Sequence, residues 1–391
     1  MNNKVVIVGA KRTPIGSFQG QFASVPADEL GAAAISGAIE QAGLKPEAID
    51  DVLMGCVLPA GIGQAPARLA SRKAGIPTSA GAVTINKACG SAMKTIQIGH
   101  DQILAGSSEI VVAGGMENMT LAPYLLPKAR GGYRMGHGEV LDHMFYDGLQ
   151  NPDDKLMMGV FGERCAEKYS FTREQQDSFS ISSIERALQA MKAEFKDEIT
   201  PVTVKSRRGE SVVSEDQEPP SCNIERIPNL RAAFKKDGTV TAASSSKISD
   251  GAAATVMMSA QKATDMGLTA LATIVAHSTY SQDPEWFTTA PIGAIKLVLK
   301  KAGWSIDEVD LFEVNEAFAA VTMAAMNELD IDHARMNVNG GACALGHPIG
   351  ASGARVVVTL INALQQRGLK KGVAALCIGG GEATALAIEL P

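Results

Sequence analysis

The feature that most constrains the fold is a repeat that relates the two ends of the chain. The segment AGLKPEAIDDVLMG (42–55) has the same pattern as AGWSIDEVDLFEVN (302–315), namely a helix end followed by a strand. The two ends stay in step further on, since EIVVAGGMEN (109–118) corresponds to ALCIGGGEAT (375–384). Two similar α/β halves place equivalent loops face to face, so the repeat predicts a functional site between the halves.

Apolar runs along the chain predict buried strands. Each run is short and rich in β-branched residues or alanine, and helical patterns lie between the runs. The runs cover residues 4–10, 109–116, 252–260, 272–278 and 373–381. We therefore expect an α/β protein. Its 391 residues exceed the roughly 250–300 at which a single core usually stops growing, which favours two fused halves.

A region between the halves breaks the pattern, and we interpret it as an inserted loop region that covers the site. It contains a polar helical segment near residues 172–195 and the charged stretch KSRRGESVVSEDQEPPSCN (205–223). The predicted organisation is an N-terminal half over residues 1–119 that is completed by a strand at about 250–270, an inserted loop domain over 120–249, and a C-terminal half over 271–391.

Composition excludes several classes of partner. The formal net charge is −6 and the basic residues are scattered, so the chain lacks the basic patch that binds nucleic acid. The first residues, MNNKVVIVGAKRTPIG, lack the regions of a signal peptide, and no apolar run approaches the length of a membrane span. Six cysteines without paired CxxC spacing do not indicate a zinc or thioredoxin-type site. We expect a cytoplasmic protein with no nucleic-acid or membrane partner.

Cys89 has the setting of a cysteine nucleophile. It lies at the expected N-terminus of a helix over residues 90–105, where free backbone N–H groups and the helix dipole favour a thiolate. A lone cysteine is more often a small buried hydrophobe. The nucleophile interpretation is preferred because two further reactive side chains, His347 and Cys377, lie in similar strand-to-turn segments.

His347 and Cys377 are the candidate partners of this nucleophile. Pro348 biases His347 towards an extended backbone and glycines crowd it on both sides, so the histidine is expected to project from a loop. Cys377 ends an apolar strand before the glycines of CIGGG (377–381), where a side chain and backbone N–H groups can point together into a cleft. A core histidine and a packed strand-end cysteine are the alternatives. Together the three residues suggest an enzyme that transfers an acyl group.

The remaining candidates have simpler interpretations. Asn315 follows the apolar run VDLFEV and lies either at the site or at a turn, where it would cap the next helix. We expect core histidines satisfied by the backbone at His100, His143 and His277, and solvent-facing ones at His137 and His333. We expect packing roles for Cys56, Cys165, Cys222 and Cys343.

Over essentially its whole length the chain resembles the thiolase family. The motifs that carry the resemblance occur in the family's order, and they are KACGSAMK (87–94), VVAGGMENM (111–119), NEAFAA (315–320), GGACALGHPIGASGAR (340–355) and CIGGG. The resemblance implies a five-layered αβαβα fold made of two similar fused halves, with a loop domain over the active site. It also implies assembly as a homodimer or homotetramer.

The resemblance implies a role for each candidate residue. Cys89 would take the acyl group from a 3-ketoacyl-CoA or acetyl-CoA, and His347 would activate the thiol and donate to the thioester oxygen. Cys377 would remove the α-proton of the second acetyl-CoA in condensation, or protonate the departing enolate in cleavage. Asn315 would hold a water that completes the first oxyanion hole with His347, and the backbone N–H groups of Cys89 and Gly379 would form the second.

Substrate contacts are implied by the same resemblance. Ser246 matches the family's pantetheine serine, and the other expected substrate-binding residues are Leu149, Met157, Met158 and Phe318. Met157 stands where many short-chain biosynthetic members have histidine, a feature that looks closer to degradative thiolases. In the pantetheine loop, Ser244 and Lys247 occupy the positions at which the family usually has Asn and Gly.

The predicted function is that of an acetyl-CoA C-acetyltransferase, which reversibly condenses two acetyl-CoA into acetoacetyl-CoA and CoA through an acyl-Cys89 intermediate. A degradative 3-ketoacyl-CoA thiolase of broader chain length is the alternative. A decarboxylating ketoacyl synthase would usually have a second histidine where Cys377 stands, and a non-catalytic acyl-CoA-binding protein is disfavoured by the intact motifs. The expected partners are acetyl-CoA, acetoacetyl-CoA or another 3-ketoacyl-CoA, and CoA. No metal or organic cofactor is expected, because a thioester is already an activated acyl donor.

Overall fold

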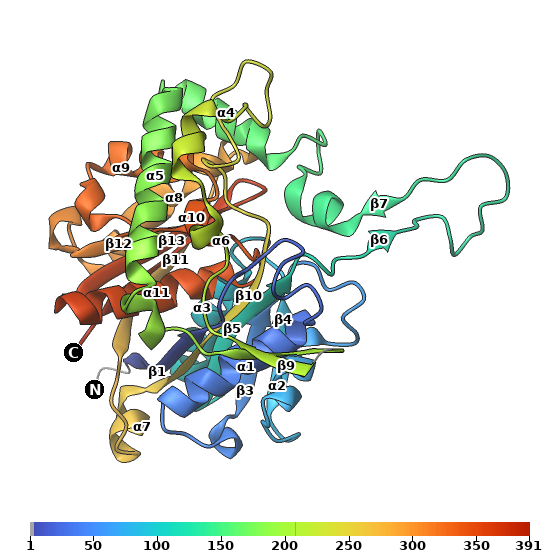
Figure 1. Ribbon diagram of the computed structural model, residues 1–391. Coiled ribbons are helices and arrows are strands. Elements are labelled where there is room, and N and C mark those ends of the chain that lie inside the picture. The colour runs from blue at the N-terminus through green and yellow to red at the C-terminus, as the bar shows by residue number, and fades with distance from the viewer. Residues whose placement is uncertain (1–3, 208) are drawn as a thin grey trace.

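The strands of the two halves meet in one mixed sheet (Figure 1). The computed structural model describes residues 4–207 and 209–391. The sheet has ten strands in the order β12-β13-β14-β11-β1-β10-β5-β3-β4, with β2 paired to β10. These strands are β1 (Val5–Arg12), β2 (Gly16–Ser17), β3 (Asp51–Gly55), β4 (Gly81–Ile85), β5 (Ile110–Asn118), β10 (Ser249–Ser259), β11 (Ala272–Ser281), β12 (Leu311–Val314), β13 (Lys371–Ile378) and β14 (Glu382–Glu389).

Two similar portions of the sheet are joined at one seam. In the N-terminal portion β3 lies parallel to β4 and β5, and in the C-terminal portion β12 lies parallel to β13. The seam between β1 and β11 is antiparallel and short, with the Cα pairs Val5–Ile274, Val6–Thr273 and Ile7–Ala272. Strands of both portions contribute to one hydrophobic core that also contains helices, so the two portions face each other across a helical layer.

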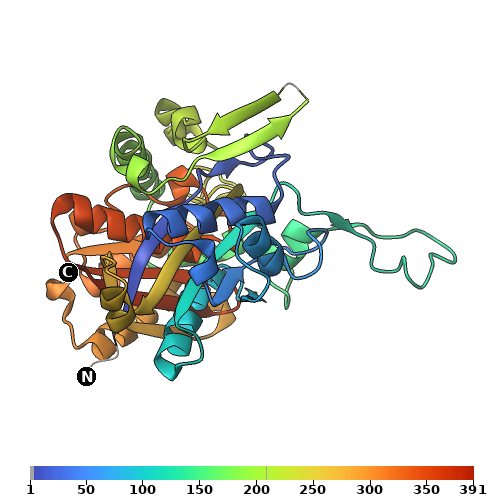
Figure 2. The same cartoon turned by 90° about the horizontal axis from the view of Figure 1, so that it is seen from below.

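Three helical layers alternate with these two portions of the sheet (Figures 1 and 2). The helices α1 (Ala27–Gln41) and α2 (Pro66–Lys73) cover the outer face of the N-terminal portion, and α8 (Ala290–Ala302) covers that of the C-terminal portion. Between the portions lie α3 (Ser91–Ala105) and α11 (Ser352–Arg367). The sequence of layers confirms the predicted αβαβα fold with five layers.

The repeat in the sequence corresponds to a repeated unit of structure. After α1 ends at Gln41, a short 3-10 turn leads into β3, and after α8 ends at Ala302, a second such turn leads into β12. The helices that follow the candidate residues are also equivalent, since α3 begins two residues after Cys89 and α11 begins five residues after His347. The predicted two similar halves are therefore confirmed.

The region between the halves carries an arm and several further helices and strands. The arm contains β6 (Tyr124–Leu125) and β7 (Leu141–Asp142), and it projects away from the layered body (Figure 1). The other elements of this region are α4 (Met158–Lys168), α5 (Arg173–Ala190), β8 (Val202–Ser206), β9 (Gly209–Val213) and α6 (Glu218–Ser221). The chain then returns to the N-terminal portion, because β10 lies between β1 and β5. The boundaries of the three-part division of the chain stay a prediction.

Local chemistry explains the longest helix of this region. The Thr172 hydroxyl accepts a hydrogen bond from the backbone N–H of Gln175, and the backbone N–H of Thr172 donates to Oε1 of Gln175. This reciprocal capping satisfies two backbone N–H groups that the first turn of α5 would leave free.

The remaining α-helices are α7 (Ala260–Asp265), α9 (Ala319–Leu329) and α10 (Ala342–Leu345). No helix among the described residues has the length and apolar character needed to cross a membrane.

A buried arginine ties the sheet to the region between the halves. Arg12, at the end of β1, donates from Nε to Glu198 at 2.5 Å and from its two terminal nitrogens to Asp216 at 2.7 and 2.9 Å. The side chains of all three residues are fully buried. The guanidinium also lies 4.8 Å from the ring centroid of Phe195. Bidentate pairing of this kind offsets the cost of removing the charges from water.

Replacing this arginine is expected to destabilise the fold. Arg12→Ala leaves two buried carboxylates without their cation, which should lower the free energy of unfolding by about 3–5 kcal/mol. The measurement is the midpoint of urea unfolding. Arg72→Ala, at an exposed position of α2, is the matched control and should change the free energy by no more than about 0.5 kcal/mol. Equal midpoints for the two variants would contradict the structural role of Arg12.

Candidate active site

A cavity of about 440 Å³ opens beside His347. All five of the expected substrate-binding residues line it, namely Leu149, Met157, Met158, Ser246 and Phe318. Other lining side chains are Phe18, Met119, Phe145, Phe234 and Ile349. Ser245, Ser246 and Lys247 supply polar groups on one side. The cavity thus combines an apolar wall with a short polar segment, as is usual for sites that bind small molecules.

Two glycines allow the His347 loop to approach the sheet of the N-terminal half. A Cβ atom on Gly115 would lie 1.9 Å from the carbonyl oxygen of Gly350, and one on Gly55 would lie 2.6 Å from the same oxygen. Neither distance is possible for a residue with a side chain. At the other end of the loop, the backbone N–H of His347 donates to the carbonyl of Lys247 at 3.0 Å. The two glycines and this backbone hydrogen bond therefore hold the His347 loop of the C-terminal half against the N-terminal half.

Hydrogen bonds define which ring nitrogen of His347 carries the hydrogen and which keeps its lone pair. Nδ1 lies 2.5 Å from the hydroxyl of Ser352, and this hydroxyl donates its own hydrogen to the carbonyl of Pro348 at 2.9 Å. The hydroxyl oxygen must then act as the acceptor towards the imidazole. Nδ1 carries the ring hydrogen, and Nε2 keeps its lone pair for another proton.

Asn315 faces this free nitrogen. Its Nδ2 lies 3.5 Å from Nε2 of His347, and its Oδ1 accepts a hydrogen bond of 3.2 Å from Arg355. Arg355 is itself buried and held by Glu313 at 2.7 Å. The arginine therefore sets the orientation of the amide group, since only the oxygen end can accept from a guanidinium.

The imidazole is neutral in this environment. Burial and, to a smaller extent, the positive charge of Arg355 together lower the pKa of His347 to about 3. Both effects penalise the protonated ring. At neutral pH the ring is thus available to accept a proton, which is the protonation state that a general base requires.

Cys89 lies beside the same cavity at the start of α3. It is half-buried and packs in a cluster with Met119, Leu149 and Ile349, which line the cavity. Burial raises the pKa of the Cys89 thiol to about 11, while a hydrogen bond from the backbone N–H of Gly379 acts in the opposite direction. The backbone N–H of Gly379 therefore lies beside the sulfur of Cys89, and the second oxyanion hole stays a prediction.

Cys377 is the second thiol at this position. It is the last residue but one of β13 and is buried in a cluster with Phe318 and Met158, two residues that line the cavity. Burial raises the pKa of the Cys377 thiol well above its usual range, and the proximity of Cys89 raises it further. The structure thus brings the two cysteines together although 288 positions separate them in the chain, from 89 to 377.

Glu117 is a supporting residue that the sequence analysis did not assign. Its carboxylate accepts from the backbone N–H groups of Val57 at 2.9 Å and Leu58 at 3.2 Å, and it also contacts the backbone of Gly350. Burial raises the pKa of Glu117 to about 7. The signal that could have revealed it is an acidic residue at the end of a fully buried strand. Ser352 and Arg355 were likewise missed, although both belong to a motif that the analysis quoted.

Several expectations for the other histidines are wrong. His143 pairs with the carboxylate of Asp147 at 2.6 Å instead of with the backbone. His333 is half-buried and stacks on Phe179 with 5.2 Å between ring centroids, so it does not simply face solvent. His100 and His277 are only partly buried and bind the side chain of Asp101. His137 is exposed as expected, and among the four packing cysteines Cys222 alone is partly exposed.

Fold and site together define an acyltransferase built from two α/β halves, and comparison with known proteins gives the family. The thiolase N-terminal domain matches residues 5–261, and the thiolase C-terminal domain matches residues 268–390. An acetyl-CoA acetyltransferase of Pseudomonas aeruginosa is 49% identical over 387 residues, which are 98% of each chain. A probable acetyl-CoA acyltransferase of Staphylococcus aureus is 45% identical over 389 residues, or 99% of each chain.

A solved structure agrees with this assignment. The crystal structure of the Bacillus anthracis acetyl-CoA acetyltransferase superposes with a TM-score of 0.97 at 42% identity, and the match covers 100% of this chain and 99% of the other. The chain therefore belongs to the thiolase family, and the predicted family is confirmed.

Removal of the hydroxyl that orients the imidazole provides a test of the site. Ser352→Ala deletes the acceptor of the Nδ1 hydrogen, so that Nε2 loses its fixed role as the unprotonated nitrogen. We expect kcat for thiolysis to fall about tenfold, the equivalent of one hydrogen bond, with little change in KM. Ser352→Thr keeps a hydroxyl and serves as the control. An unchanged kcat in Ser352→Ala would show that another group holds the ring.

The reactivity of Cys89 should report its raised pKa. Because the thiolate is the reactive form, the rate of alkylation by iodoacetamide is expected to rise about tenfold per pH unit from pH 7 towards the pKa of about 11. The measurement is the rate of modification of Cys89 followed by mass spectrometry, with a peptide containing the same motif for comparison. A plateau below pH 8 would contradict a protonated resting thiol.

Proposed function

We propose that this thiolase is an acetyl-CoA C-acetyltransferase, which interconverts two acetyl-CoA with acetoacetyl-CoA and CoA. The observation that carries the proposal is the meeting of Cys89 and Cys377 beside a neutral histidine whose Nε2 carries no hydrogen. The names of the relatives support the same activity. This arrangement supplies a nucleophile, a base and a second proton carrier without any further group.

The first half-reaction transfers an acyl group to Cys89. His347 Nε2 accepts the thiol proton as the sulfur attacks the thioester carbonyl carbon, and the carbonyl electrons move to its oxygen. The Nε2–H then donates to that oxygen, together with a water held by the Asn315 amide. When the tetrahedral adduct collapses, the CoA sulfur leaves with the proton from His347. Acyl-Cys89 and CoA–SH are the products.

The second half-reaction makes or breaks the carbon–carbon bond. In condensation the thiolate form of Cys377 removes the α-proton of the second acetyl-CoA, and the resulting carbanion attacks the carbonyl carbon of acyl-Cys89. The N–H groups of Cys89 and Gly379 stabilise the oxyanion that forms. When the adduct collapses, the carbon–sulfur bond to Cys89 breaks and the Cys89 sulfur takes the proton from Cys377, so that acetoacetyl-CoA and the Cys89 thiol are released. In cleavage the Cys377 thiol returns the proton to the departing enolate, and its raised pKa suits a group that holds its proton until that step.

The proposal requires no metal and no organic cofactor. A thioester activates its carbonyl carbon and acidifies the neighbouring carbon, so two thiols and an imidazole are sufficient for the chemistry. We further propose acetyl-CoA, acetoacetyl-CoA and CoA as the ligands of the cavity. A cytoplasmic location suits these ligands.

A homodimer or homotetramer is proposed as the assembly. The edge strand β4 exposes its backbone and Val83, which is 48% exposed. The arm, which contains β6 and β7, carries exposed apolar side chains, with Tyr124 at 68% and Met135 at 96%. Exposed apolar side chains on an edge and on an arm support contacts with further copies of the chain.

A degradative 3-ketoacyl-CoA thiolase is the second candidate. Met119, Phe145, Met157 and Phe234 give the cavity an apolar wall, which suits an acyl chain longer than acetyl. The name of the Staphylococcus aureus relative, an acyltransferase, leaves the same alternative open. The two candidates share every chemical step and differ only in the substrate that the wall accepts.

The deciding experiment is CoA-dependent cleavage of acetoacetyl-CoA and of a 3-ketoacyl-CoA with a longer chain. Loss of the 3-ketoacyl thioester is followed for wild type and Cys89→Ala. We expect kcat/KM to be higher for acetoacetyl-CoA, and we expect Cys89→Ala to lose at least about 10³-fold in kcat because the covalent route is removed.

Each other result has a definite meaning. A higher kcat/KM for the longer substrate would support the degradative candidate. Binding of CoA thioesters without cleavage by the wild type would identify a non-catalytic binding protein. Retained cleavage in Cys89→Ala would contradict the acyl-cysteine route.

A further inference from the structure

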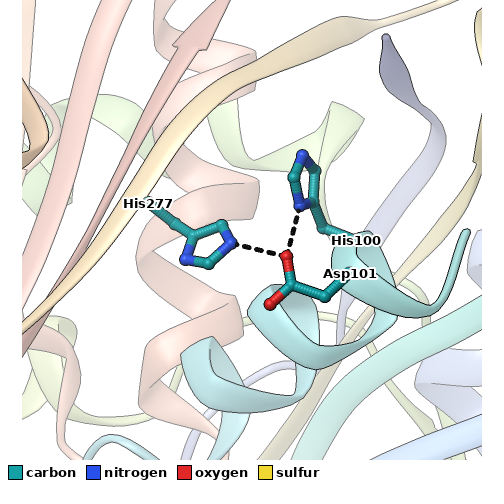
Figure 3. Close-up of side chains that lie close together, drawn as sticks. All are labelled: His100, Asp101 and His277. Carbon is teal, nitrogen blue, oxygen red and sulfur yellow. Dashed lines mark hydrogen bonds and ion pairs between the residues drawn. The ribbon is translucent and has the colours of Figure 1, made fainter. Parts of the chain in front are cut away.

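Two histidines from different halves converge on one carboxylate (Figure 3), and none of the three residues lines the cavity beside His347. His100 and Asp101 lie on α3, and His277 lies on β11 of the C-terminal half. Nδ1 of His100 and Nε2 of His277 each lie 2.9 Å from the same oxygen, Oδ1 of Asp101. The ring centroids are 5.0 Å apart and the rings are nearly perpendicular, at 84°.

We propose that His100, Asp101 and His277 bind a divalent transition-metal ion such as Zn²⁺. One ligand atom from each residue lies within 4.8 Å of the other two. An ion with bonds of about 2.0–2.2 Å holds neighbouring ligand atoms about 2.9–3.5 Å apart, in octahedral or tetrahedral geometry. The two distances of 2.9 Å already have this value. Small side-chain movements are therefore sufficient to bring all three ligand atoms to bonding distance from one ion.

The kind of ligand selects the kind of ion. Two imidazoles and one carboxylate suit Zn²⁺, Co²⁺ and Ni²⁺, whereas Mg²⁺ and Ca²⁺ require mostly oxygen ligands. The Asp101 side chain is 60% exposed, so water can occupy the remaining positions around the ion. The site is thus an open three-ligand site at the surface and not a closed structural one.

Metal binding requires a change of tautomer at both rings. In the hydrogen-bonded form Nδ1 of His100 and Nε2 of His277 donate to Asp101, and for metal binding these nitrogens must offer lone pairs. The ring hydrogens then move to the opposite nitrogens, Nε2 of His100 and Nδ1 of His277, which have no hydrogen-bond partner within residues 4–207 and 209–391. Neutral imidazoles accomplish this with no net loss of protons.

Neighbouring groups limit the affinity. Lys301 places its ammonium 2.8 Å from the backbone carbonyl of His277 and brings a positive charge near the site. In the part of the chain that the structure describes, neither histidine has a second carboxylate behind it to fix its orientation, as strong zinc sites usually do. The expected site is reversible, and it responds to the supply of metal.

An ion at this position would join the two halves directly. α3 begins beside Cys89 and its last turns carry His100 and Asp101, whereas β11 belongs to the other half. A ligand that binds only the folded state stabilises it by mass action. Zn²⁺ should therefore raise the melting temperature of the protein, although the ion takes no part in acyl transfer.

The test measures metal binding in the full chain after removal of metals with a chelator. Zn²⁺ binding is followed by calorimetry and by the shift in melting temperature, with Mg²⁺ in parallel. We expect Asp101→Asn and His277→Ala to weaken Zn²⁺ binding at least about tenfold and to abolish the thermal shift. Asp101→Asn is nearly isosteric, so it keeps the fold even if His277→Ala does not. His137→Ala, at an exposed position of the arm, should bind as the wild type does.

Co²⁺ separates this site from the cysteines. Its visible spectrum reports nitrogen and oxygen ligands, and a charge-transfer band in the near ultraviolet reports thiolates. We expect wild type to show a visible spectrum that Asp101→Asn loses, with thiolysis activity of Asp101→Asn unchanged. Equal Zn²⁺ affinity and equal Co²⁺ spectra in wild type, Asp101→Asn and His277→Ala would overturn the proposal. The group would then be a hydrogen-bonded triad only.

Discussion

The contact between α3 and α11 is the constraint on which the site depends. A Cβ atom on Gly353, in the first turn of α11, would lie 2.3 Å from the backbone nitrogen of Met93 in α3. The two helices therefore touch backbone to backbone at the ends that follow Cys89 and His347. Since these helices are the central layer, their contact decides how far apart the candidate nucleophile and base lie.

Burial gives the site its chemical character. The same helical layer and the two sheet portions that surround it remove water from the thiols and the imidazole, and this raises the pKa of the Cys89 thiol and lowers that of His347. The resting site thus holds neutral partners. A neutral pair avoids the cost of a buried ion pair until a substrate carbonyl supplies the place for negative charge.

Much of the fold and of the site follows from local patterns in the chain. Short apolar runs bounded by glycine predict the strands, because side chains on both faces of a covered sheet must be apolar. The quoted motifs also carry Cys89, His347, Asn315 and Cys377, and these residues could be predicted because each depends on spacing within a short segment. Of the predicted residues that line the cavity, only Phe318 lies in a quoted motif, and the other four came from the resemblance to the thiolase family, namely Leu149, Met157, Met158 and Ser246.

Other features depend on which segments meet in space. The sequence determined the two similar halves, the strands and the identities of the reactive side chains. Only the tertiary structure decided the orientation of the Asn315 amide by Arg355, the free nitrogen of His347, and the convergence of His277 on Asp101. The physical reason is that periodicity fixes the face of an element on which a residue lies, whereas packing between elements fixes which atoms become its neighbours.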